Sequence, residues 1–205
     1  MKKTNDERLQ DLFSYLDSLS YIKSGSIPDI PLYMDQVTTF MDEHLARMKR
    51  YPEDKVLTKT MINNYAKNNL LPPPLKKKYT KEHMLMLIFI YYFKNLLSFN
   101  DIEELFRPIT GGQFSGDGKL SLERIYNEVF SLEDRQMENL KADIREKFQV
   151  ASDTFQDAPE DEQEYLRLFA FICELSFDVY LKKQMIEMLA DQLREEAPET
   201  DKKKK

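Results

Sequence analysis

The chain has 205 residues and a formal net charge of −6, with 41% apolar and 32% charged residues, which predicts one or two globular domains with a charged exterior. A single cysteine, Cys173, excludes an intramolecular disulfide and favours a reducing compartment. The longest apolar run, residues 84–93, is far shorter than the ~20 residues of a membrane helix, and the first ten residues lack a signal-peptide core. We therefore expect a cytoplasmic protein that does not span a membrane.

Helical periodicity dominates the first half of the chain, and four of the five glycines are confined to residues 111–118. Apolar residues at helical spacing predict a first helix over 5–20, followed by a linker to residue 27 that contains Gly25 and leads to Pro28 and Pro31. Four further helices are predicted within residues 28–108: about 34–50, 58–69, 80–97 with Thr80 as N-cap, and a last one that Ser98 and Asp101 begin and Pro108 closes.

The second half is also predicted to be helical, after a glycine-rich joint at 109–120. Helices are expected over about 121–130, 132–150 and 161–195 within a region that ends at 198, and residues 199–205 form a basic tail. The 161–195 helix has two interpretations that the sequence leaves open. It is either a self-association helix or an ordinary core helix of a single bundle, and no heptad register persists through it.

One segment of this acidic chain is free of acid. Residues 55–81 carry seven lysines and no carboxylate, whereas the remainder carries 23 basic and 36 acidic residues. On a helix, Thr60, Asn63, Asn64 and Lys67 form one polar stripe, opposite apolar residues. Asparagine can bind an adenine edge, and threonine and lysine can hold phosphates. The stripe is therefore suited to contact with a polyanion.

Three consecutive lysines, Lys76, Lys77 and Lys78, follow this helix after a stiff run of three prolines. Each lysine that neutralises a phosphate steepens the salt dependence of binding by roughly 0.9 log units per log of salt. An acidic body with one basic face would confine nucleic-acid contact to that face. A solvated lysine-rich surface without a ligand is the simpler alternative.

Residues 28–108 resemble a family of uncharacterised bacterial proteins whose shared segment is similar to the MerR-type winged helix-turn-helix. The resemblance rests on Tyr65 with Leu70 and Leu71 after the recognition helix, on Lys78 and Tyr79 in the wing, and on LSFNDI at 97–102. Asn69 stands where the family usually has glycine, Asn63-Asn64-Tyr65 replaces Arg-Tyr-Tyr, and the connection between the first two helices is longer.

The resemblance implies an all-α chain, with a MerR-like winged helix-turn-helix domain followed by a helical C-terminal region for dimerisation or effector binding. It implies a homodimer that binds double-stranded DNA and regulates transcription; no residues identify a small-molecule effector. The predicted DNA-binding residues are Lys59, Thr60, Asn63, Asn64, Lys67, Lys76, Lys77, Lys78 and Tyr79, with Tyr79 bracing the wing.

The rival hypothesis is a helical adaptor whose basic face binds an acidic protein partner. We do not expect an enzyme, a metal site or a cofactor. His44 and His83 lie in separate predicted helices, no zinc-ligand spacing is present, and no glycine-rich phosphate-binding motif occurs.

Overall fold

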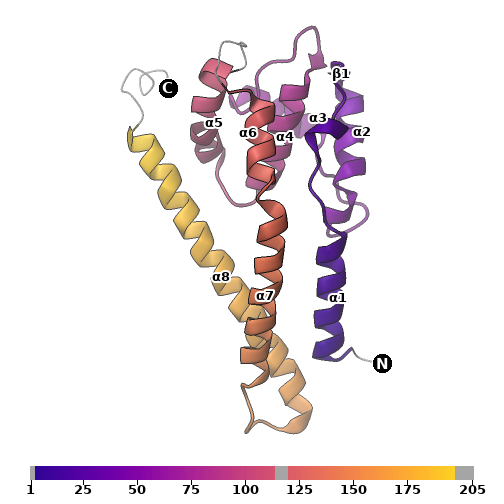
Figure 1. The fold of residues 1–205 in the computed structure, drawn as a ribbon, viewed down its shortest axis with the longest axis vertical. Coiled ribbons are helices and arrows are strands. Elements are labelled where there is room, and N and C mark those ends of the chain that lie inside the picture. The colour runs from indigo at the N-terminus through magenta and orange to yellow at the C-terminus, as the bar shows by residue number, and fades with distance from the viewer. Residues whose placement is uncertain (1–2, 114–119, 197–205) are drawn as a thin grey trace. The chain divides into compact units, whose positions relative to one another are not determined.

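The computed structural model describes residues 3–113 and 120–196, and it is mostly helical, as predicted (Figure 1). The α-helices are α1 (Asn5–Ser18), α2 (Met34–His44), α3 (Lys59–Lys67), α4 (Lys81–Phe93), α5 (Phe99–Gln113), α6 (Leu122–Phe130), α7 (Glu133–Ser152) and α8 (Glu160–Glu196). Two 3₁₀ turns, η1 (Ser24–Ser26) and η2 (Ala46–Met48), and two short strands, β1 (Leu32–Tyr33) and β2 (Lys78–Tyr79), complete it.

The chain divides into two compact units. Unit 1 contains residues 1–20 and 131–185, and unit 2 contains residues 21–130 and those from 186 onward. In unit 1, α1 and α7 pack on the first part of α8 around Leu16, Ile144, Ala151 and Phe171. Unit 2 holds every residue of the predicted DNA-binding set. The boundaries predicted at 28, 108 and 120 remain predictions about independent domains.

The core of unit 2 is built around α4. Every residue from His83 to Ile90 is buried, which confirms that this helix, apolar on nearly all sides, lies inside its domain. Phe89 makes edge contacts with Phe106 of α5 and Tyr126 of α6. The Tyr126 hydroxyl donates to the carbonyl of Ile22, so α6 closes onto the segment after α1 within this unit. This core carries α2 and α3 on its surface.

The two strands form a small antiparallel ribbon that joins distant parts of unit 2. Leu32 pairs with Tyr79 and Tyr33 pairs with Lys78. The segment before α2 is thereby fixed to the segment before α4. Periodicity did not predict this ribbon, because strands of two residues are too short to show alternation.

Several predicted helix ends shift. Helix α2 ends at His44 and is followed by η2, so the connection to α3 is longer than a tight helix-turn-helix turn, as expected. The prediction that Pro108 closes the fifth helix is wrong, because α5 continues to Gln113. Ile102 and Phe106 of this helix are buried, and their packing outweighs the hydrogen bond that proline cannot donate. The predicted joint is therefore helical as far as residue 113, and residues 114–119 and the predicted tail at 199–205 lie outside the described residues.

None of the described helices combines the length and apolarity that crossing a lipid bilayer requires.

Candidate nucleic-acid interface

Helix α3 presents the predicted polar stripe to solvent. Thr58 caps the helix by accepting a hydrogen bond from the Met61 amide at 3.2 Å. Ile62 and Tyr65 are buried in the core, and burial raises the pKa of the Tyr65 hydroxyl. The burial of Ile62 and Tyr65 determines which side of α3 faces the core. The opposite face is exposed and consists of Thr60, Asn63, Asn64 and Lys67.

The end of α3 is a sharp, defined turn. Asn69 adopts a left-handed backbone with φ 57°, the conformation that glycine usually supplies at this position. The Leu70 amide donates to the Tyr65 carbonyl at 2.9 Å and the Asn69 amide to the Ala66 carbonyl at 3.4 Å, which is the Schellman pattern. Leu70 and Leu71 then enter the core. Asn69 therefore supplies the left-handed backbone that ends α3.

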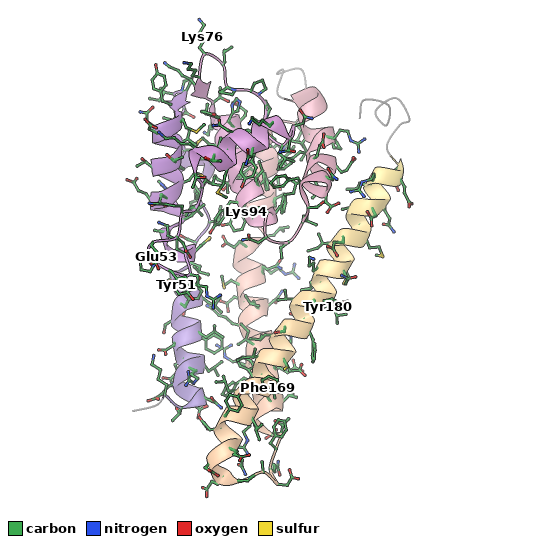
Figure 2. All side chains as sticks on the ribbon, turned by 180° about the vertical axis from the view of Figure 1, so that it is seen from behind. Tyr51, Glu53, Lys76, Lys94, Phe169 and Tyr180 are labelled. Carbon is green, nitrogen blue, oxygen red and sulfur yellow. The ribbon has the colours of Figure 1, made fainter. Side chains whose placement is uncertain are left out.

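The chain next reverses in a tight turn that we call the basic turn, residues 75–78. The Lys78 amide donates to the Leu75 carbonyl at 3.0 Å. The two central residues, Lys76 and Lys77, have φ of 51° and 64°. Positive φ at both positions is the signature of a type I′ turn, which usually contains Asn-Gly. Here two exposed lysines occupy it, and Figure 2 shows Lys76 at its tip, directed away from the helices.

The base of the basic turn is fixed by aromatic residues. The Lys78 ammonium lies over the Tyr33 ring, 5.0 Å from its centroid, so this lysine is held against the ribbon. Tyr79 is buried, and burial raises the pKa of its hydroxyl. Its ring meets that of His83 edge-on at 5.6 Å. Tyr79 therefore supports the turn from inside, and its role in a DNA-binding wing stays a prediction.

His83 connects the basic turn to α4. Its Nδ1 accepts a hydrogen bond from the Thr80 amide at 3.1 Å, so histidine takes the place of glutamate in the capping box. This hydrogen bond requires that Nδ1 carries no proton, so the imidazole is in its neutral form. Burial lowers the pKa of His83, and the carbonyls of Pro73 and Pro72 partly offset this effect. His83 therefore helps to cap α4 with a buried side chain.

The lysines of the segment differ in their electrostatic partners. Lys59 forms an ion pair with Asp35 at the start of α2, and Lys81 bridges Asp29 and Glu123, each at 2.9 Å. Those carboxylates raise the pKa of Lys81. Within residues 3–113 and 120–196, Lys67, Lys76 and Lys77 form no ion pair. A phosphate can meet each of these three without displacing a carboxylate.

An open cleft of about 430 Å³ lies beside the start of α3. Its walls include Asp42 and Glu43 of α2 as well as Lys55 and Lys59. The Lys49 ammonium, which donates to Asp42, lowers the pKa of that carboxyl. Two carboxylates on this wall repel a polyanion, so phosphate contact is favoured on the basic-turn side of α3.

Sequence reasoning missed three contributors. Tyr33 and Asp35 belong to segments far from the lysines in the chain. The β1–β2 pairing brings Tyr33 close to Lys78, and the packing of α2 against α3 brings Asp35 close to Lys59. Lys94, at the end of α4, donates to the Val56 carbonyl at 2.9 Å and lies 4.8 Å from the centroid of the Tyr91 ring. Burial lowers the pKa of Lys94, which Figure 2 labels within unit 2. Lys94 therefore tethers the segment that leads into α3.

In the part of the chain that the structure describes, no three His, Cys, Asp or Glu side chains gather in a way that suits a metal ion.

Comparison with protein families gives one finding. A family model described as "Domain of unknown function (DUF1836)" matches residues 22–129. This span nearly coincides with the first segment of unit 2, residues 21–130. It includes α3, the basic turn and the ribbon, whereas α1, α7 and α8 lie outside it. No curated protein and no solved structure matches the chain.

Proposed function

We propose that this chain, which belongs to the family described as a domain of unknown function (DUF1836), is a sequence-specific DNA-binding regulator of transcription. In this proposal α3 enters the major groove of double-stranded DNA and the basic turn acts as a wing on the phosphate backbone. The resemblance of residues 28–108 to MerR-type winged helix-turn-helix domains supports the proposal. The proposed function is binding alone and includes no catalytic step.

The observation that carries the proposal is the backbone of the basic turn. A left-handed residue other than glycine costs about 1–2 kcal/mol, and this turn contains two, Lys76 and Lys77. A turn that served only to reverse the chain would be more stable with Asn-Gly. Strained positions cluster at functional sites. Two lysines at the tip of a hairpin therefore point to a need for positive charge there.

The polar stripe of α3 supplies groups for reading bases. Asn63 and Asn64 offer amides, which can donate to and accept from the same adenine edge, and Thr60 offers a hydroxyl and a methyl group. No carboxylate lies on this face of α3 to repel DNA. Lys67, at the last turn of α3, can reach a phosphate at the edge of the groove.

The phosphate contacts divide into two kinds. Lys76 and Lys77 can bind a phosphate directly, as can Lys67. Lys59 must first exchange Asp35 for a phosphate, and Lys78 remains over Tyr33. With one phosphate for each of the three free lysines, the proposal predicts a slope of log affinity against log salt of about −3, or steeper if Lys59 also engages.

A homodimer completes the proposal. Two copies of α3 would meet neighbouring half-sites about one helical turn, roughly 34 Å, apart on the duplex. The helices outside the family domain are then available to hold the two copies together.

The experiment that tests the proposal measures fluorescence anisotropy on labelled duplexes over a salt series. The full chain is titrated into DNA from upstream of its own gene and into a scrambled duplex of the same composition. The proposal predicts tighter binding to the upstream DNA. It also predicts that the triple variant Lys76→Ala, Lys77→Ala and Lys78→Ala has a shallower salt slope, with Lys23→Ala, an exposed lysine outside the segment, as the control.

Two outcomes would contradict the proposal. Equal, weak binding to both duplexes would reduce it to nonspecific attraction. Absence of binding at low salt would favour the rival function, an adaptor that uses the same lysines to hold an acidic protein partner.

A further inference from the structure

The first part of α8 carries an exposed apolar surface that its own unit does not use. On its inner face, Phe171 and Leu175 pack with α7, and the Phe171 and Phe148 rings meet edge-on at 5.3 Å. The other face carries what we call the α8 stripe. Its members and exposed fractions are Tyr165 (69%), Phe169 (52%), Ile172 (51%), Val179 (57%) and Tyr180 (60%).

The α8 stripe follows one side of the helix and is interrupted by the exposed Ser176, between Ile172 and Val179. Tyr165, Phe169 and Ile172 follow at spacings of four and three, and Val179 lies seven residues further on, so they share one side. The exposed rings of Tyr165 and Phe169 stack with their centroids 6.5 Å apart. Figure 2 labels Phe169 and Tyr180 on this helix. A run of this kind on a surface helix is typical of a helix that packs against a partner.

The exposed area is of the size that a dimer uses. A large aromatic side chain has about 150–250 Å² of surface, so the five members together expose on the order of 500 Å². With a polar rim this approaches the roughly 800 Å² per partner of a standard protein interface. It is at the upper end of the apolar patches, about 300–600 Å², that monomers expose.

The distribution of charge along α8 selects the partner and its direction. The first turn of α8 is acidic, with Glu160, Asp161 and Glu162, whereas Lys183 follows the stripe beside Lys182, which forms an ion pair with Asp178 of the same helix at 2.7 Å. In an antiparallel pair centred on Ile172, residues equally distant from Ile172 face each other. Asp161 then faces Lys183 of the second copy. A parallel pair would place like charges together and align the helix dipoles unfavourably.

We infer that the α8 stripe is the surface through which two copies of this chain associate, with the two α8 helices antiparallel and their two-fold axis near Ile172. Tyr165 then packs against Val179 of the second copy, and Ile172 against its own counterpart. Each copy brings α1, α7 and α8, so the pair forms a helical bundle with the stripes in its core. The inference deepens the homodimer of the proposed function, but it rests only on unit 1.

Sedimentation equilibrium of the full chain without DNA tests the association. We expect a dimer for the unchanged protein. Ile172→Glu should raise the dissociation constant at least about 100-fold, because the charge enters the interface twice. The matched control is Val150→Glu on α7, which changes an exposed apolar residue of the same unit outside the stripe and should leave the dimer intact. Circular dichroism verifies that both variants keep the fold.

Disulfide formation tests the direction of the helices. With Cys173→Ser in both chains, Tyr165→Cys is mixed with Val179→Cys and the mixture is oxidised. An antiparallel pair brings these two positions within the short Cα separation that a disulfide requires and yields the mixed species. Disulfides between two Tyr165→Cys chains would instead indicate a parallel pair and overturn the inferred direction.

The remaining outcomes separate this inference from the proposed function. A protein that stays monomeric at high concentration, or an Ile172→Glu variant that dimerises as the unchanged protein does, overturns the α8 interface. A monomer that still binds upstream DNA specifically refutes only the interface. A dimer that binds no DNA refutes only the DNA-binding proposal.

Discussion

Replacing Lys76 and Lys77 by Asn and Gly separates the two roles of the basic turn. The substitution keeps the type I′ geometry and supplies the residues that favour it. Glycine pays no penalty at φ 64° and asparagine a reduced one at φ 51°, so unfolding should become less favourable by about 1–2 kcal/mol. For a chain of this size that corresponds to a rise in Tm of about 3–6 °C.

The same substitution should weaken DNA binding. It removes two cations that are free to meet phosphates, so the slope of log affinity against log salt should decrease in magnitude by about 2. Thermal melting and the anisotropy salt series measure the two effects on one protein. A more stable protein that binds DNA less well cannot be explained by misfolding.

The matched control is Lys76→Arg with Lys77→Arg, which preserves both the charge and the left-handed backbone. Its Tm and salt slope should be close to those of the unchanged protein. The reasoning is refuted if the Asn-Gly variant is destabilised, because the turn is then not strained. It is equally refuted if the salt slope is unchanged, because the lysines then do not contact phosphates.

Three further predictions follow from the surroundings of the basic turn. Asp35→Asn frees Lys59, so DNA binding should tighten and the salt slope should steepen by up to about 0.9; weaker binding would contradict this. Burial lowers the pKa of His83, so between that pKa and the 6.5 of an ordinary histidine the unfolded chain binds more protons. The free energy of unfolding should therefore fall as the pH drops below about 6.5 in urea titrations, and His83→Gln should reduce that dependence. Asn69→Ala should lower the free energy of unfolding by about 1 kcal/mol, whereas Asn69→Gly should be neutral or stabilising, since φ is 57° there. If Asn69→Ala and Asn69→Gly changed the free energy of unfolding equally, a left-handed backbone at residue 69 would be excluded.

The sequence predicted those features that depend on neighbouring residues. Periodicity located the helices, and the rotation of α3 followed from Ile62 and Tyr65 because apolar side chains at these positions must face the core. The capping of α4 by Thr80 and of α5 by Ser98, with Asp101, followed from short-range hydrogen-bond patterns that the structure confirms.

Features that depend on tertiary packing were not predicted. The Lys78–Tyr33 contact joins residues that the ribbon brings together, and the Asp35–Lys59 ion pair joins residues that the packing of α2 against α3 brings together. Pro108 was interpreted from local geometry alone, although the buried residues Ile102 and Phe106, which precede it in the helix, hold α5 against the core. The left-handed lysines were also missed, because lysine carries no sequence signal for positive φ.

The central claim is that α3 reads base sequence, and selection from a library of random duplexes tests it most directly. The unchanged protein and the Asn63→Ala, Asn64→Ala variant are each carried through the selection, and affinities for the enriched and scrambled duplexes are compared. We predict an enriched motif for the unchanged protein and a loss of about 1–3 kcal/mol of discrimination per asparagine in the variant, with its salt slope preserved. Recovery of no motif by the unchanged protein, or of the same motif with the same discrimination by the variant, would contradict the claim.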